Sequence, residues 1–159
     1  MRICLRQIRI LWPIFFPLAT CYLLLYTYCM ADKKKILIAE DDTFLQGLVS
    51  SKLGKSGFEV MVANNGKDAI KLSDENTPDI ILLDLVMPGT DGFAALEKIR
   101  KSSATKKTPI IVFSNLAEAK DIERARELGA NEFMIKSNFT LDELVDKINE
   151  FVKAGQGLK

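Results

Sequence analysis

The stretch Asp79–Gly92, which reads DIILLDLVMPGTDG, decides the fold. Its apolar run at residues 80–83 is too short for a globular helix and follows Pro78, so it is typical of a strand buried on both faces. Asp84 stands where this run gives way to a Pro-Gly turn. Ligands of open parallel sheets bind at the carboxyl ends of strands. A lone Asp before a turn is more often a turn residue or a helix cap. A functional role for Asp84 therefore requires residues of suitable chemistry at the ends of the other strands.

Short apolar runs and helix-like segments alternate along the chain on both sides of this stretch. Alternation of this kind, with strands rich in Ile, Leu and Val, predicts an α/β fold in which helices cover both faces of a parallel sheet. The predicted strands are 35–39, 58–63, 80–83, 110–113 and 132–135, and the predicted helices are 43–56, 67–75, 93–101, 117–128 and one from about 141.

Capping residues mark several of the predicted helix starts. Asp42 and Asp91 precede helices and have side chains suited to accept their first backbone N–H groups. Asn65 lies in an Asn-Asn-Gly turn that is expected to cap the next helix. Thr140 and Glu143 have the spacing of a capping box, which predicts where the last helix begins.

The first 29 residues differ in composition from the rest of the 159-residue chain. All cysteines, the only Trp and all tyrosines precede Met30. The only charged residues of this leader are three arginines, so the later part has 19 basic residues against 21 acidic ones and a net charge of −2. Residues 10–31 carry no charge and are long enough to span a bilayer. We therefore expect a hydrophobic leader at 1–29, a domain at 30–154 and a tail at 155–159.

Three interpretations of the leader compete. We disfavour a signal peptide, because no convincing cleavage site precedes Ala31. A membrane anchor through residues 10–30 ranks second, because basic residues flank the apolar segment on both sides and specify its orientation weakly. We favour an upstream extension from a misassigned start, with initiation at Met30 and a cytoplasmic protein.

Residues of matching chemistry end the other predicted strands. Glu40 and Asp41 follow the first strand, Ser114 ends the fourth and Lys136 follows the fifth, so all of them would share one sheet edge with Asp84. Clustered carboxylates need a counter-charge, and Mg²⁺ prefers carboxylate oxygen. The chain has no histidine, which argues against zinc or copper. A carboxylate beside a cation can attack a phosphoryl group, and Lys136 and Ser114 are suitable partners for the transferring oxygens.

Together these motifs resemble a known family. Residues 33–153 are similar to the receiver domain of two-component response regulators, through ILIAEDD, LLDLVMPGTDG, IIVFS, GANEFMIK and the terminal helix. No single motif is specific for this family, but the five motifs together are. The resemblance implies a flavodoxin-like, doubly wound, five-stranded parallel sheet with strand order 2-1-3-4-5.

The resemblance also implies a role for each site residue. Asp84 would be the phosphoacceptor, and Lys136 would pair with the phosphoryl group. Ser114 would be the switch hydroxyl and Phe133 the switch aromatic. The expected Mg²⁺ ligands are Asp41 and Asp84 directly, Glu40 through water, and the backbone carbonyl of Val86. The signalling face would be residues 117–153.

Structural alternatives remain for three of these residues, and two positions depart from the family pattern. Ser114 could cap a helix beginning near residue 117, Phe133 could be simple core, and Lys136 could be a solvated charge. Asn115 replaces the usual small residue after the switch hydroxyl and could narrow access to Asp84. Ser137 replaces the usual proline after the lysine, which predicts a trans peptide bond and a differently shaped loop.

The expected function is a stand-alone response regulator. It would accept a phosphoryl group on Asp84 from a histidine kinase or phosphotransfer protein and signal by contact with a downstream protein. We expect only self-phosphorylation and autodephosphorylation, not a true enzyme: Val86 replaces the second Asp of a haloacid-dehalogenase-type phosphatase. The slightly acidic domain gives no support for nucleic-acid binding. The alternative is a pseudo-receiver, a binding module that works without phosphorylation.

Overall fold

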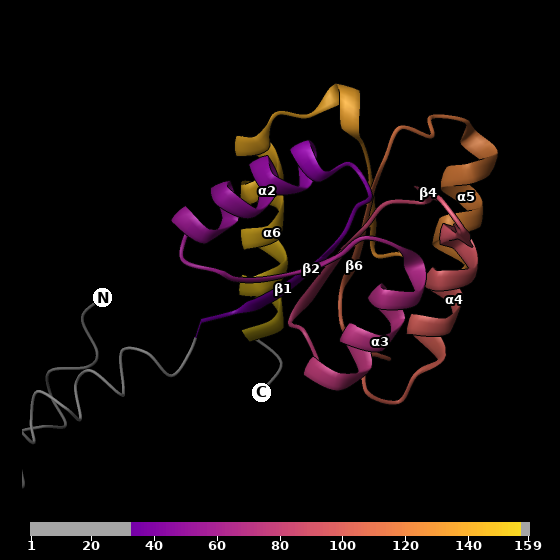
Figure 1. Cartoon of the computed structure of the whole chain (residues 1–159), viewed down its shortest axis with the longest axis horizontal. Coiled ribbons are helices and arrows are strands. Elements are labelled where there is room, and N and C mark those ends of the chain that lie inside the picture. Colours follow the sequence, from indigo (N-terminus) through magenta and orange to yellow (C-terminus); the bar gives the residue numbers. More distant parts are fainter. Residues whose placement is uncertain (1–32, 157–159) are drawn as a thin grey trace, which may run out of the picture. The chain divides into compact units, whose positions relative to one another are not determined.

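Five parallel strands form the central sheet. The computed structural model describes residues 33–156 (Figure 1), so the expected leader lies outside the described residues. The strands are β1 (Lys35–Ala39), β2 (Glu59–Ala63), β3 (Ile80–Leu83), β6 (Ile110–Ser114) and β7 (Glu132–Ile135), and they lie in the order β2-β1-β3-β6-β7. Two further strands, β4 (Val86–Met87) and β5 (Thr90–Asp91), form a separate antiparallel hairpin. Counting only the strands of the main sheet, the order is the predicted 2-1-3-4-5, and the flavodoxin-like fold is confirmed.

Helices cover both faces of this sheet. They are α2 (Thr43–Lys55), α3 (Gly66–Asn76), α4 (Gly92–Lys101), α5 (Ala119–Glu127) and α6 (Leu141–Gln156), with a 3₁₀ turn, η2, at Lys136–Asn138. Helices α2 and α6 lie on one face, and α3, α4 and α5 lie on the other (Figure 1). Among the described residues, we find no helix whose length and apolar content would suffice to traverse a bilayer.

The alternation of side chains along each strand explains the two layers. In β1, Ile36 and Ile38 pack with α2 and α6, whereas Leu37 and Ala39 pack with the helices opposite. Strand β3 is buried along its whole length. It is the central strand, paired with β1 on one side and β6 on the other. The continuous apolar run at residues 80–83 therefore reflects burial on both faces.

The predicted caps are present. The Asp42 carboxylate accepts the N–H groups of Phe44 and Leu45, and the Asp91 carboxylate accepts that of Phe93. Asn65 caps α3 by accepting the N–H of Asp68. The capping box of α6 is formed, with the Glu143 carboxylate accepting the Thr140 N–H at 2.7 Å and Thr140 Oγ1 accepting the Glu143 N–H at 3.3 Å.

Two predicted helix boundaries differ from the structure by two residues, and several others differ by one. Helix α5 begins at Ala119 rather than 117, and no side chain caps its start. Helix α6 continues to Gln156, so residues 155 and 156 are helical rather than part of the expected tail. Residues 157–159 lie outside the described residues.

Candidate functional site

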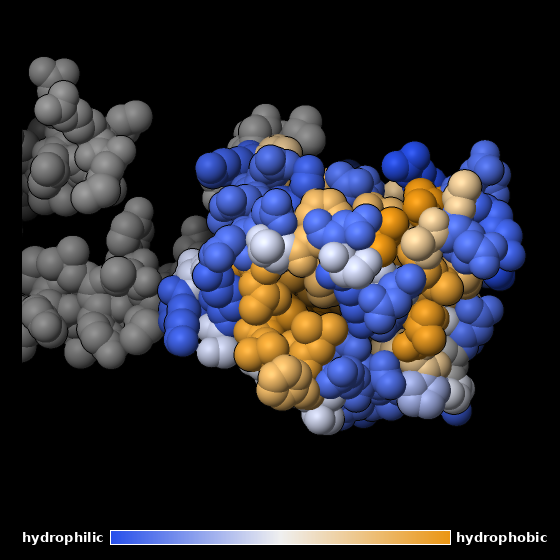
Figure 2. All heavy atoms as spheres, turned by 90° about the horizontal axis from the view of Figure 1, so that it is seen from above, coloured by the Kyte–Doolittle hydropathy of each residue, from blue (hydrophilic) through white to orange (hydrophobic). Residues whose placement is uncertain are grey.

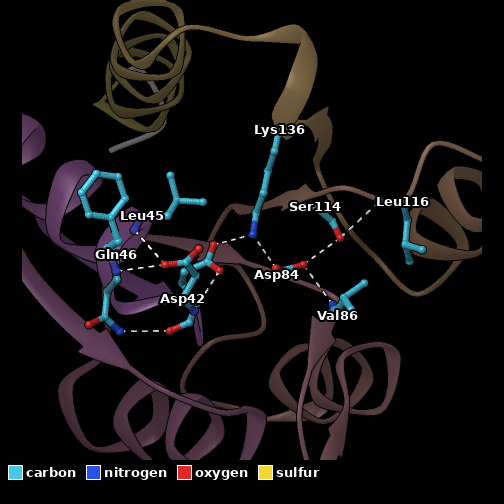
Figure 3. Close-up of polar contacts among 10 residues, drawn as sticks. Asp42, Leu45, Gln46, Asp84, Val86, Ser114, Leu116 and Lys136 are labelled. Atoms are coloured by element: carbon cyan, nitrogen blue, oxygen red, sulfur yellow. Dashed lines mark hydrogen bonds and ion pairs between the residues drawn. The ribbon is translucent and has the colours of Figure 1, made fainter.

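The polar strand ends converge at one edge of the sheet. Glu40 follows β1, Asp84 follows β3, Ser114 ends β6 and Lys136 follows β7. Glu40 is 4% exposed, Asp84 5% and Ser114 0%. Charged or polar side chains are rarely buried so completely without partners, and Figure 3 shows that Lys136 and Ser114 point toward Asp84. The structure thus brings together the residues that the sequence placed at a common edge.

Lys136 joins the two buried carboxylates. Its Nζ lies 2.5 Å from Glu40 Oε2 and 2.5 Å from Asp84 Oδ2, and it also lies over the ring of Phe113. Burial alone would lower the pKa of Lys136, but hydrogen bonds and charge from Asp84 and Glu40 outweigh burial and raise it. Lys136 is therefore held as a cation, and the interpretation as a solvated surface charge was wrong.

Burial and the partner Lys136 shift the pKa of the Glu40 carboxyl in opposite directions. Burial raises the pKa of the Glu40 carboxyl, while the hydrogen bond and charge of Lys136 lower it less strongly. One cation shared by two buried carboxylates leaves a net negative charge. The site therefore has electrostatic capacity for a further positive charge.

The second oxygen of Asp84 has two donors. Ser114 Oγ donates to Asp84 Oδ1 at 2.7 Å, and the backbone N–H of Val86 donates to the same oxygen at 2.9 Å. Helix α5 begins five residues after Ser114, so Ser114 is not the cap of that helix. The donors hold the Asp84 carboxylate in a fixed orientation at the edge of the sheet (Figure 3).

Three carboxylates form a group that fits a hard divalent cation. One oxygen from each of Glu40, Asp41 and Asp84 lies within 4.8 Å of the others. Octahedral Mg²⁺ holds oxygens at about 2.1 Å, so opposite ligands are roughly 4.2 Å apart, which small side-chain movements would reach here. Asp41 retains access to solvent, unlike Glu40 and Asp84. The ligand roles of these residues and of the Val86 carbonyl stay predictions.

Gln46 supports the site and was missed by the sequence argument. Its side-chain amide donates to the backbone carbonyl of Glu40 at 3.0 Å and to Asn64 Oδ1 at 2.8 Å. It thereby ties the first turn of α2 to the ends of β1 and β2. A polar residue one turn after the helix cap Asp42 is the only sequence signal, and that signal is weak.

The structure also gives the burial and surroundings of Phe133, Asn115 and Ser137. Phe133 is 9% exposed and packs in the core cluster on the face of α3, α4 and α5, so its role as a switch stays a prediction. Asn115 and Ser137 are exposed. No cis peptide bond occurs in the described chain, and Ser137 lies in η2, as expected without the proline.

Large apolar side chains are exposed on the segments that carry the site. Phe44 lies two residues after Asp42, Val86 two residues after Asp84, and Phe139 three residues after Lys136. They are 75%, 55% and 38% exposed. Seen from above, the domain shows apolar areas between polar side chains (Figure 2).

Comparisons with known proteins agree with this geometry. A family model described as the response regulator receiver domain matches residues 36–149. A probable transcriptional regulator ycf27 of Guillardia theta is 31% identical over 78% of this chain and 47% of its own length. Chemotaxis protein CheY of Bacillus subtilis is 33% identical over 73% of this chain and 95% of its own. The receiver domain of sensor histidine kinase PA1611 of Pseudomonas aeruginosa PAO1, with magnesium coordinated in its active-site cleft, is 26% identical (TM-score 0.70) over 77% and 99% of the two chains.

This chain belongs to the response regulator receiver family of two-component systems. Members of this family are signalling phosphoacceptors rather than classical enzymes. The chain spans about half the length of the ycf27-type relatives that it matches, whereas it spans nearly all of CheY.

Proposed function

We propose that this protein accepts a phosphoryl group on Asp84 in a Mg²⁺-dependent reaction and signals by protein contact. The observation that carries the proposal is the environment of Asp84. Lys136 and Ser114 each contact one of its carboxylate oxygens, and two further carboxylates lie beside it. A buried carboxylate with a cationic partner, a hydroxyl donor and a cation-binding group is equipped for phosphoryl transfer.

The phosphoryl donor comes from outside these 159 residues, because they contain no histidine. A carboxylate oxygen of Asp84 attacks the phosphorus of a phosphohistidine on a kinase or phosphotransfer protein. The P–N bond breaks, its electron pair returns to the imidazole, and Asp84 becomes an acyl phosphate. Exposed Phe44, Val86 and Phe139 give a protein donor apolar surface to contact beside the acceptor.

The neighbouring residues orient and stabilise this transfer. Lys136 Nζ, already on Asp84, is placed to pair with a phosphoryl oxygen, and Ser114 Oγ is placed to donate to another. Bound Mg²⁺ would offset the charge of the carboxylates and of the phosphoryl oxygens. In our proposal Asp41 and Asp84 bind it directly, with the Val86 carbonyl, and Glu40 acts through water.

Output is proposed through residues 117–153. Ser114 ends β6 and pairs in register with Ile135 of β7, two residues from Phe133. Movement of the hydroxyl toward a phosphoryl group would therefore be felt in β7 and in α5 and α6, which pack beside it. The proposed location is cytoplasmic, where kinases and phosphate donors are found. The proposal concerns residues 30–154, whether or not the leader is retained.

The alternative is a pseudo-receiver that binds partners without phosphorylation. The close approach of Glu40, Asp41, Asp84 and Lys136 weighs against it, because a module that never uses phosphate has no need of such a costly buried group.

Intact mass after incubation with acetyl phosphate and Mg²⁺ tests the proposal. We expect the parent protein to gain one phosphoryl group, and Asp84→Asn and Asp41→Asn to gain none. Asp42→Asn is the matched control, because Asp42 is an adjacent acid that caps α2 and Asn keeps that cap. If the parent gains no phosphoryl group and Mg²⁺ does not raise its stability, the pseudo-receiver explanation replaces ours.

A further inference from the structure

The turn between β1 and α2 carries two of the three clustered acids, Glu40 and Asp41. The Glu40 N–H donates to the carbonyl of Ala63, the last residue of β2, at 3.0 Å. The Asp42 N–H donates to Glu40 Oε1 at 3.3 Å. These bonds fix the peptide groups before Glu40 and after Asp41. Neither of them fixes the peptide group that joins Glu40 to Asp41.

Gln46 holds that peptide group. Its side-chain amide donates to the Glu40 carbonyl oxygen at 3.0 Å, and the bond is partly buried (Figure 3). The atoms of a peptide unit lie in one plane, from the Cα of one residue to the Cα of the next. A fixed Glu40 carbonyl therefore also fixes the direction in which the chain reaches the Cα of Asp41.

Asp41 is the clustered acid whose position depends most on its backbone. The carboxylates of Glu40 and Asp84 both pair with Lys136. Among the described residues, the Asp41 carboxylate has no hydrogen-bond or ion-pair partner, and it is the acid of the three that solvent reaches. Loosening of the turn would therefore displace Asp41 more than the other two acids.

The geometry of α2 directs Gln46 toward this turn. Gln46 lies four residues after the cap Asp42, and its backbone N–H donates to the Asp42 carbonyl at 2.8 Å. Residues four apart lie on the same face of a helix, and each Cα–Cβ bond tilts toward the helix N-terminus. The Gln46 side chain thus reaches back along α2 to the turn that precedes the helix.

Asn64 fixes the orientation of the same amide group. Gln46 Nε2 also donates to Asn64 Oδ1 at 2.8 Å. Asn64 directly follows β2, and the next residue, Asn65, caps α3. An amide nitrogen has two hydrogens, so one Gln46 side chain bridges the acidic turn and the end of the neighbouring strand. The bridge orients the amide before any ion binds.

We propose that Gln46 is a positioning residue for the cation site: it fixes the Glu40–Asp41 peptide group and thereby sets the affinity for Mg²⁺ without contacting the ion. This inference rests on the Mg²⁺ role that we propose above for Asp41. Groups that orient metal ligands typically change metal affinity roughly 10- to 100-fold when they are removed. Gln46 belongs at the lower end of that range, because Glu40 and Asp84 have partners of their own.

Calorimetric titration with Mg²⁺, without a phosphoryl donor, measures this affinity directly. Gln46→Met keeps an unbranched side chain that favours a helix about as well as Gln, but it removes both donors. We expect the Kd for Mg²⁺ to rise roughly tenfold.

Asn76→Ala is the matched control for a lost amide bond. The partly buried Asn76 side chain also donates to a backbone carbonyl, that of Leu72, at 3.0 Å. Asn76 is the last residue of α3, whereas the site lies at the end where α3 begins. Asn76→Ala should leave the Kd for Mg²⁺ within about twofold of the parent value. An equal rise of the Kd in both variants would overturn the proposal, because general destabilisation would then explain it.

A double-mutant cycle tests the bridge to Asn64. Asn64→Ala removes one of the two acceptors, so it should raise the Kd for Mg²⁺ by less than Gln46→Met does. In the Gln46→Met background it should have no further effect, because the bridging amide is already absent. Additive effects of the two substitutions would contradict the proposed bridge.

The rate of phosphorylation by acetyl phosphate separates positioning from chemistry. Because Gln46 acts on Asp41 rather than on Asp84, Gln46→Met should raise the half-saturating Mg²⁺ concentration roughly tenfold. At saturating Mg²⁺ the rate should return to within about twofold of the parent rate. A reduced maximal rate with an unchanged half-saturating Mg²⁺ concentration would overturn the proposal.

Amide hydrogen exchange in EDTA tests the positioning without the cation. The hydrogen-bonded amides of Glu40 and Asp42 should exchange several-fold faster in Gln46→Met than in the parent. The Asp84 amide, which donates to the Ala39 carbonyl, should change less. A parent protein that binds no Mg²⁺ would refute the proposed function and this inference with it. Equal Mg²⁺ affinity of the parent and Gln46→Met, or unchanged exchange of both amides, would overturn this inference alone.

Discussion

Lys136 balances two carboxylates that would otherwise repel each other in a buried site. Both of its partners lie at 2.5 Å, and Glu40 and Asp84 have side chains only 5% exposed. Removing one partner of a buried ion pair is costly because the remaining charges are left uncompensated. We therefore expect the stability of the domain and the proposed chemistry of Asp84 to depend on the same lysine.

We predict that Lys136→Met lowers the free energy of unfolding by about 3 kcal/mol in EDTA. Saturating Mg²⁺ should return part of this loss, because the ion supplies the missing positive charge. Urea unfolding with and without Mg²⁺ measures both quantities. Lys147→Met is the control, since Lys147 pairs with Glu132 and Glu150 at the surface and should cost less than about 1 kcal/mol. A variant that Mg²⁺ stabilises no more than the parent would contradict this account.

The sequence was sufficient to predict that these residues share one edge of the sheet. It was not sufficient to predict which side chains contact one another. Glu40, Asp84, Ser114 and Lys136 follow strands, and parallel strands align their carboxyl ends, so topology alone predicts a common edge. The pairing of Lys136 with Glu40 as well as Asp84 depends on side-chain rotamers, which a sequence pattern does not encode. Gln46 was missed for the same reason, because its partners are a backbone carbonyl and a side chain 18 residues away.

At the scale of elements, the hairpin β4–β5 connects the proposed acceptor, Asp84, to α4. Val86 lies opposite Asp91 in this hairpin, and Asp91 caps α4. The turn brings Gly92 against Leu85: a Cβ atom on Gly92 would lie 2.3 Å from the Leu85 Cα. Only a glycine fits there without movement of the backbone that carries Asp84 and Val86.

Gly92→Ala should therefore destabilise the domain, by about 1–3 kcal/mol from overpacking. Gly47→Ala is the matched control in α2, where an added Cβ meets no atom within 4 Å. That change should instead stabilise the domain, by about 0.5–1 kcal/mol, because Ala favours the helix over Gly. Thermal unfolding of the two variants should move in opposite directions, and a neutral Gly92→Ala would show that the hairpin adjusts freely.

The capping box of α6 makes a prediction about pH. Hydrogen bonds from Thr140 lower the pKa of the exposed Glu143 carboxyl from its usual 4.5. A carboxyl with a lowered folded-state pKa stabilises the protein above its unfolded pKa and loses that contribution as the pH falls through the folded value. Glu143→Ala should thus lower the urea midpoint at pH 7, and the difference should shrink below pH 4.5. An equal lowering of the midpoint at pH 7 and at pH 3 would contradict this explanation.

The helices and strands of the main sheet were largely predictable. Most helices have apolar residues at helical spacing, and the buried strands are continuous apolar runs. The start of α5 was placed two residues early, since no side chain caps that helix and the pattern alone sets no boundary. The strands β4 and β5 are two residues each, too short to show any period. Their hairpin is instead fixed by the Pro-Gly turn and the close approach of Gly92 to Leu85.

At the scale of the whole molecule, the parallel sheet separates two kinds of chemistry. All helices that follow a strand begin at the edge that carries Asp84 and end at the opposite edge, where the lysines of residues 98–107 lie. The carboxyl ends collect the residues that we propose for phosphoryl transfer, and the amino ends carry the lysines of residues 98–107. A donor protein that docks beside Asp84 would therefore leave the opposite edge uncovered.

The central claim is that Asp84 is the residue that becomes phosphorylated, and the most direct test is to locate the phosphoryl group. After reaction with acetyl phosphate and Mg²⁺, borohydride reduces an aspartyl phosphate to homoserine, which tandem mass spectrometry assigns to a position. We predict homoserine at position 84 in the parent protein and none in Asp84→Asn. Homoserine at position 41 or 42, or an unchanged Asp84 in protein that carries the phosphoryl mass, would contradict the account.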